Sequence, residues 1–119
     1  MGTARFTRAS RLLKPAEYKR VFSAGKSSKD SCFVVLGTNN GLSHPRLGMA
    51  ISKRHVKRAV DRNRVKRLIR EAFRQNQEAV PGLDLVVLGR QGVDKKRNSE
   101  ICDSLDEHWK SIKQRCVKS

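Results

Sequence analysis

The segment from Lys53 to Arg74 constrains the fold more than any other part of the sequence, because it is both amphipathic and strongly basic. At 100° per residue its apolar side chains fall on one face, which must pack against the rest of the protein. That stripe consists of Val65, Leu68, Ile69 and Ala72, with Phe73 at its edge. The segment therefore predicts a long helix, from His55 to about Asn76, that covers one face of a sheet.

The rest of this predicted helix is a cationic ridge, since the segment holds ten Lys and Arg residues against two acidic ones. Like charges four residues apart repel each other by roughly 0.2–0.5 kcal/mol per pair. A solvated face normally mixes the two signs, so the ridge favours an anionic partner. Arginine predominates, and its guanidinium binds phosphate oxygens in pairs and stacks on bases, which favours nucleic acid. The ridge and its shoulders comprise Arg62, Asn63, Arg64, Lys66, Arg67, Arg70 and Arg74.

The charge of the whole chain indicates the same kind of partner. Its 119 residues include 27 Lys and Arg and 11 Asp and Glu, a formal net charge of +16. A compact fold with that charge repels itself unless a polyanion neutralises it. A membrane surface is the weaker interpretation, because no apolar run approaches the roughly 20 residues that a span needs. The N-terminus lacks the apolar segment of a secretory signal, so we expect the protein in the cytoplasm.

The first half of the chain predicts one helix and two strands. Pro15 opens a helix that Gly25 ends, and its apolar stripe is Tyr18, Val21 and Phe22. Residues 32–36 and 46–52 are rich in strand-forming side chains. Because turn residues separate these two runs, they predict an antiparallel hairpin with a long loop.

Three further features complete the predicted architecture of the single domain. In the second strand Gly48, Ala50 and Ser52 give one face only small side chains, which lets a packed helix or a ligand approach the backbone; the helix is the favoured interpretation. Residues 83–88 form an almost wholly apolar strand for the interior of the sheet. A last amphipathic helix over 99–114 carries a tryptophan on its core stripe.

The cysteines and histidines give no metal-site pattern. An odd number of cysteines without CxxC spacing favours reduced structural thiols, and these are Cys32, Cys102 and Cys116. The histidines are scattered among basic and polar residues, which favours solvated side chains over metal ligands. They are His44, His55 and His108.

The central motif of the basic segment resembles a known signature. Arg62-Asn63-Arg64 within AVDRNRVKRLIREAFR resembles the RNR motif of the bacterial ribonuclease P protein family. The resemblance extends to RLLKPAEYKRVFSAG at the first helix, PRLGMAISKR before the basic helix and GLDLVVLGRQGV after it, in the order and spacing of the family. Together these motifs span Arg11 to Trp109.

The resemblance implies an α+β fold, a single-domain α-β-β-β-α-β-α sandwich over residues 11–115. It adds a short strand near Lys26 and a left-handed crossover around the basic helix, as in the second domain of ribosomal protein S5. A right-handed crossover is the usual choice, so the implied hand is unusual. Residues 1–10 would be a flexible basic segment and residues 116–119 a C-terminal tail.

The resemblance also implies two RNA partners and no obligate protein partner. The RNR helix would contact the catalytic RNA of ribonuclease P. A cleft between the first helix and the sheet would bind the single-stranded 5′ leader of precursor tRNA, because aromatic rings stack on unpaired bases while cations follow the backbone. The implied cleft residues are Tyr18, Phe22, Val34 and Leu36. Charge near the cleft would come from Lys53 and Arg54, and from Arg62, Asn63, Lys66 and Arg70 of the basic helix. From spacing alone, the core is the favoured interpretation for the aromatic side chains of the first helix, because any core-facing stripe would show the same pattern.

No catalytic residue is predicted in the protein itself. The acidic residues Asp103, Asp106 and Glu107 share a helix with core positions and have no histidine in a metal-ligand pattern. The resemblance implies that the RNA subunit and its Mg²⁺ ions cleave the leader, and that the protein binds no cofactor of its own. A general RNA-binding or ribosome-associated protein would share the charge, whereas a stand-alone metal-dependent nuclease would need clustered carboxylates.

Overall fold

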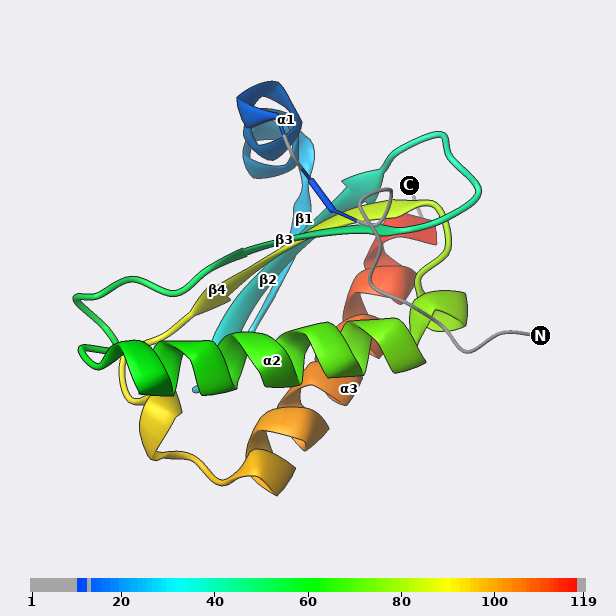
Figure 1. Ribbon diagram of the computed structural model, residues 1–119. Coiled ribbons are helices and arrows are strands. Elements are labelled where there is room, and N and C mark those ends of the chain that lie inside the picture. Colours follow the sequence, from blue (N-terminus) through cyan, green and yellow to red (C-terminus); the bar gives the residue numbers. More distant parts are fainter. Residues whose placement is uncertain (1–10, 13, 118–119) are drawn as a thin grey trace.

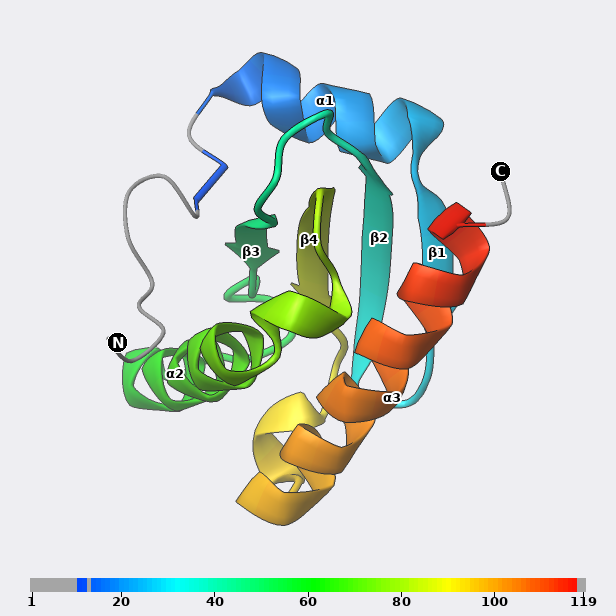
Figure 2. The ribbon, with the colours of Figure 1, turned by 90° about the vertical axis from the view of Figure 1, so that its right-hand side faces the viewer.

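The protein has three layers, a helix, a four-stranded sheet and a pair of helices (Figures 1 and 2). The computed structural model describes residues 11–12 and 14–117. Helix α1 covers one face of the sheet, and α2 and α3 cover the other. The elements in chain order are α1 (Pro15–Ala24), β1 (Lys26–Lys29), β2 (Phe33–Asn39), β3 (Arg46–Ala50), α2 (Ala59–Gln75), η2 (Gln77–Ala79), β4 (Leu83–Gly89), η3 (Val93–Lys95) and α3 (Asn98–Val117). The predicted α+β sandwich, with its extra strand at Lys26, is confirmed.

The order of strands in the sheet is β1-β2-β4-β3. Strand β2 pairs antiparallel with both β1 and β4, while β3 pairs in parallel with β4. The predicted hairpin between residues 32–36 and 46–52 is therefore wrong, because β4 lies between those two runs. The apolar side chains of β4 stabilise it most in the centre of the sheet, where both of its faces are covered.

The connection from β3 through α2 to β4 is a left-handed crossover. Both strands run away from the viewer in Figure 2, with β3 to the left of β4 and α2 beneath them. The path from one strand to the next through α2 is therefore counterclockwise. This geometry confirms the implied hand against the usual right-handed preference.

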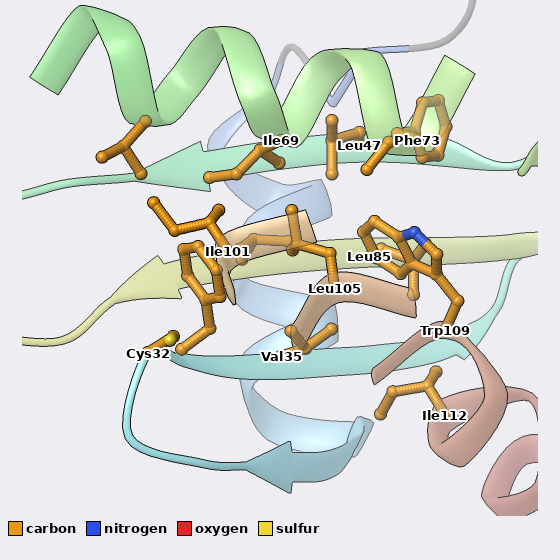
Figure 3. Close-up of a cluster of buried hydrophobic side chains, with 14 of the residues drawn as sticks. Cys32, Val35, Leu47, Ile69, Phe73, Leu85, Ile101, Leu105, Trp109 and Ile112 are labelled. Carbon is orange, nitrogen blue, oxygen red and sulfur yellow. The ribbon is translucent and has the colours of Figure 1, made fainter. Parts of the chain in front are cut away.

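The main core lies between the sheet and the helices α2 and α3 (Figure 3). Alternate strand residues such as Val35, Leu47 and Leu85 point into it, and they meet Ile69 and Phe73 of α2. From α3 come Ile101, Leu105, Trp109 and Ile112, all at most 1% exposed. The tryptophan packs edge-on against Phe73, with ring centroids 6.4 Å apart, which confirms it as a core residue.

A smaller apolar cluster fastens α1 to the opposite face of the sheet. Val21 is its only buried residue within α1, and it packs with Leu12 and Val86. A Cβ added at Gly48 would lie 2.5 Å from the Tyr18 ring, so this ring rests directly on the backbone of β3. The small side chains of β3 therefore admit a packed helix, as predicted.

The structure corrects the prediction for His108. This side chain is 3% exposed, with Nδ1 2.8 Å from the Ser28 hydroxyl and Nε2 3.1 Å from a carboxylate oxygen of Asp30. His108 lies three residues after Leu105 and four before Ile112, so it shares their buried stripe. The hydrogen bond of Nδ1 with Ser28 makes burial of the ring tolerable, and Nε2 lies close to the Asp30 carboxylate although it makes no hydrogen bond of good geometry.

Several boundaries also differ from the sequence prediction. Helix α2 begins at Ala59 instead of His55, and residues 53–58 form an irregular segment ahead of it. Helix α3 continues through Val117 and buries Cys116, so the first two residues of the predicted C-terminal tail, 116–119, belong to the helix. The cysteines of the described part are free thiols. The predicted N-terminal segment, residues 1–10, lies outside the described residues. None of the described helices is long and apolar enough to cross a membrane.

Candidate RNA-binding surfaces

The two arginines of the RNR motif are bonded within the protein. One Nη of Arg62 donates to the carbonyl oxygens of Val56 and Lys57, both at 2.9 Å. Arg64 reaches the opposite flank of α2, where it donates to the carbonyl of Asp94 at 2.8 Å and to the side chain of Asn98. These two side chains hold the segments before α2 and after β4 against the helix.

Other cations of the helix remain unengaged. Lys66, Arg67 and Arg70 have no hydrogen bond or ion pair to another residue in the described part of the chain. Arg74, by contrast, pairs with Glu71 at 2.6 Å, and this hydrogen bond is the main reason that the pKa of Glu71 is lowered. Asn63, between Arg62 and Arg64 in the sequence, is exposed. The predicted ridge therefore divides into cations that shape the protein and cations that are available to phosphate.

Although α1 and α2 lie on opposite faces of the sheet, residues of both line the same hollow at the outer edge of β3. The hollow has a volume of about 390 Å³, and its lining includes Tyr18 from α1, Gly48 from β3, and Lys66 and Arg70 from α2. The structure thus brings a predicted cleft residue next to two predicted ridge residues. A single bound strand of nucleic acid can therefore contact the predicted cleft and the cationic ridge at the same time.

Beyond α1 the sheet face is only partly covered. In the row nearest α1, Val86 is fully buried beneath the helix, with Leu36 half-buried beside it. In the next row Val34 pairs with Leu88, and both are half-buried, while Ala50 on the other side of Leu88 is exposed. The adjoining hollow of about 670 Å³ is lined by Ser31, Val34, His55, Leu88, Gly89, Arg90 and Gln91. This part of the sheet offers an apolar floor to a flat ligand.

The apolar stripe of α1 contains both buried and exposed side chains. Val21 is fully buried, whereas the neighbouring Phe22 is 52% exposed. Arg20 reaches toward Asp84 at the start of β4. Tyr18 and Phe22 lie two residues before and after Arg20, so their side chains project from nearly the opposite side of the helix. They therefore face the partly covered row of the sheet that contains Val34 and Leu88. The pKa of Tyr18 is raised, first by burial and then by the charge of Glu17, so its hydroxyl stays protonated.

The predicted cations Lys53 and Arg54 lie in the segment between β3 and α2, and both are exposed. Arg54 lines a third hollow, of about 430 Å³, whose other cationic side chains are Lys57, Arg58 and Lys95. None of these last three was singled out from the sequence. Their place in a basic segment was a weak signal, but only the folded loops bring Lys95 next to Arg58.

Leu88 is the other surface residue that the sequence did not indicate. It belongs to a strand that is apolar throughout, so periodicity cannot tell its open face from its core face. Only its pairing with Val34 and Ala50 shows that it faces the α1 side. Taken together, the described surface offers aromatic and apolar groups next to cations, which suits unpaired nucleotides. Within the described residues, no group of three His, Cys, Asp or Glu side chains is arranged to hold a metal ion.

The comparisons with known proteins agree with this geometry. A family model described as Ribonuclease P matches residues 6–113. The ribonuclease P protein component of Nitrosococcus oceani is 46% identical over 114 residues, which cover 96% of this chain and 96% of that protein. The corresponding protein of Pseudoalteromonas atlantica is 40% identical over 119 residues, which cover 100% of this chain and 99% of that protein.

Solved structures give the same answer for the fold. The RNase P protein of Staphylococcus aureus aligns with a TM-score of 0.80 at 34% identity, covering 87% of this chain and 95% of that one. The RNase P protein of Thermotoga maritima aligns with a TM-score of 0.79 at 32% identity, covering 86% of this chain and 99% of that one. With its RNR helix, its sandwich fold and these relatives in agreement along nearly the whole sequence, the chain belongs to the ribonuclease P protein family.

Proposed function

We propose that the chain is the protein subunit of ribonuclease P and promotes removal of the 5′ leader from precursor tRNA. The observation that carries this proposal is the position of Tyr18, which packs against the sheet cluster that includes Leu36 and Leu88 and also lines a hollow with Lys66 and Arg70 of α2. Such a surface suits a single strand that emerges from a structured RNA, because the bases can stack while the backbone meets positive charge. Membership of the family supports the same role.

In this proposal the two RNA partners use different surfaces. The catalytic RNA docks on α2, with Lys66, Arg67 and Arg70 as direct phosphate contacts and Asn63 and Arg74 beside them. Arg62 and Arg64 contribute by holding the flanking segments, which the hydrogen bonds described above support. The leader lies over Tyr18, Phe22, Val34 and Leu36, with Lys53 and Arg54 near its backbone.

The division of chemistry follows from the same proposal. The catalytic RNA and its Mg²⁺ ions cleave the phosphodiester, and the protein screens phosphate repulsion and holds the leader. The protein alone is inactive and needs no cofactor of its own. This work takes place in the cytoplasm, together with tRNA synthesis.

A series of leader lengths tests the proposal. The reconstituted complex is titrated with mature tRNA and with precursors whose leader grows one nucleotide at a time. We expect the affinity to rise with the first few nucleotides and then to level off, and we expect the RNA subunit alone to show a much smaller rise. Equal affinity for mature tRNA and for every precursor would instead favour a general RNA-binding protein.

A further inference from the structure

Asp84 is a charged side chain at a fully buried position, at the end of the sheet beneath α1. Its side chain is 0% exposed, and both carboxylate oxygens accept two hydrogen bonds. Arg46 donates to both oxygens, at 2.8 and 2.7 Å, and Asn40 donates to one of them at 3.0 Å. The fourth bond comes from Arg20 of α1. The carboxylate therefore joins the helix to strands β3 and β4 and to the loop after β2.

Four charged side chains in the network around Asp84 balance one another. Arg46 also donates to Glu17 of α1, at 2.7 Å, so two carboxylates balance two guanidinium groups. Burial alone would raise the pKa of Asp84, but the hydrogen bonds from Arg46 and Asn40 and the charges of Arg46 and Arg20 hold it below its ordinary value. In a chain of net charge +16, these two arginines are neutralised within the protein instead of being left for phosphate.

The apolar contact of α1 with the sheet is small by comparison. Val21 is the only buried residue of the helix, and its cluster with Leu12 and Val86 is completed by the partly buried Tyr18, Leu36 and Leu88. At its C-terminal end α1 continues directly into β1, and Gly25 lies close to the backbone of Gly37. The N-terminal and middle parts of the helix are tied to the sheet by Glu17 and Arg20 through the network. These ties determine how far Tyr18 and Phe22, on the other side of α1, lie from Val34 and Leu88 of the sheet.

We propose that Asp84 is a positioning residue for the leader site: by holding Arg20 and, through Arg46, Glu17, it fixes α1 so that Tyr18 and Phe22 face Val34 and Leu88 at stacking distance from a bound base. This inference rests on the proposed function and names the group that sets the geometry of its site. Asp84 itself touches no RNA. A displacement of about 1 Å at a binding group is enough to lose much of its effect, so the anchor controls affinity from a distance.

The test removes one arm of the network and leaves the buried carboxylate with its other partners. Arg20→Gln abolishes the ion pair from α1, and Lys19→Gln is the matched control, because Lys19 is an exposed cation of the same helix with no ion pair or hydrogen bond among the described residues. The readout is the ratio of the affinities of the reconstituted complex for a precursor with leader and for mature tRNA. The affinity of each variant for the catalytic RNA is measured alongside.

For Arg20→Gln we expect this ratio to fall by about tenfold, which corresponds to ~1.4 kcal/mol of binding free energy. We expect affinity for the catalytic RNA and for mature tRNA to stay within about twofold of wild type in the same variant. Lys19→Gln should leave the ratio unchanged. Arg20→Lys, which keeps the charge but cannot bond to Asp84 and Asn39 with one planar group, should restore only part of it.

Other results would overturn the inference. An unchanged ratio in Arg20→Gln, or an equal fall in Lys19→Gln, would mean that α1 is held without the Asp84 network or that charge alone matters. A wild-type complex that does not distinguish precursor from mature tRNA would contradict the proposed function instead. Asp84→Asn gives a second measurement, and hydrogen exchange of the α1 amides in the free protein should be faster in this variant than in wild type. Unaltered exchange would also contradict the anchor.

Discussion

Arg62 and Arg64 illustrate how little a basic side chain reveals about its role until its partners are known. Both lie in the signature motif, yet their guanidinium groups already bond to carbonyl oxygens of the segments that flank α2. Arg67 and Arg70 lie on the same helix, and neither has a hydrogen bond or ion pair among the described residues. The four residues have the same charge, and the difference between them arises only when the loops close around the helix.

The double variant Arg67→Ala and Arg70→Ala tests the direct role of the unengaged arginines. We expect weaker binding to the catalytic RNA and a flatter dependence on salt, by roughly 0.7–0.9 in the slope of log K against log salt for each lost phosphate contact. The melting temperature of the free protein should hardly change, because these side chains have no partners within the described structure. Binding is measured over a range of KCl concentrations.

The control for this prediction is the double variant Lys110→Ala and Lys113→Ala, which removes two exposed cations from α3. An equal loss of affinity in the control would mean that only net charge matters. Arg64→Ala should behave differently from both, because it leaves the carbonyl of Asp94 and the side chain of Asn98 without their donor. Its melting temperature should fall modestly, since a hydrogen bond at a partly exposed site contributes about 0.5–1.5 kcal/mol.

Phe22 and Val21 differ in their surroundings although they are neighbours in sequence. Phe22→Ala is expected to lower affinity for precursor tRNA by about 1–3 kcal/mol per base stacked, and to spare mature tRNA. Its effect on stability should be small because the ring is 52% exposed. Val21→Ala should do the reverse and cost ~2–3 kcal/mol of unfolding free energy, because Val21 is fully buried. Urea unfolding of the free proteins and titration of the complexes give both quantities. A large loss of stability in Phe22→Ala would show that the ring belongs to the core.

At the scale of elements, the contact of α3 with the β1–β2 turn depends on a polar cluster. Asp30 in that turn accepts hydrogen bonds from Ser104 and from the backbone N–H groups of Cys32 and Phe33, and it lies beside His108. Burial alone would raise the pKa of Asp30, but these bonds lower it from 3.8 to about 2. The folded state therefore favours the charged carboxylate of Asp30.

The lowered pKa predicts an acid-dependent contribution to stability. Because the folded-state value lies below the unfolded one, the contribution is present above pH ~4 and is lost as the pH falls toward 2. The difference in unfolding free energy between wild type and Asp30→Asn should therefore shrink from pH 5 to pH 2, and it should be modest because Asp30 is 37% exposed. Asp103→Asn, an exposed change on α3, serves as the control in urea unfolding. A difference that stays constant with pH would contradict this role of Asp30.

The sequence predicted each helix and strand better than it predicted their partners. The stripe of Val65 and Ile69 determines which side of α2 is buried, and the alternation in β3 correctly indicated a close approach by a helix. Strand pairing was not accessible in this way, since the apolar residues of β4 suit several neighbours and the turn at residues 39–45 does not encode which strand follows. The buried position of His108 depends on Asp30 and Ser28, which are about 80 residues away in the sequence.

At the scale of the whole molecule, the two predicted RNA surfaces are continuous. They meet at the outer edge of β3, where Tyr18 lies near Lys66 and Arg70. The family resemblance indicated the members of both surfaces and implied that Lys66 and Arg70 lie near the cleft, and the position of β3 at the edge of the sheet explains why the two surfaces join there. A net charge of +16 spread over such a surface should replace part of the Mg²⁺ that an RNA needs to overcome phosphate repulsion.

The most direct test of the central claim is cleavage of precursor tRNA as a function of Mg²⁺ concentration, with three samples: the RNA-free protein, the catalytic RNA alone, and the two combined. We expect no cleavage by the protein at any Mg²⁺ concentration, cleavage by the RNA alone only at high Mg²⁺, and cleavage by the complex at markedly lower Mg²⁺. Cleavage by the protein from which all RNA has been removed, or an RNA whose Mg²⁺ requirement is the same with and without the protein, would contradict the account.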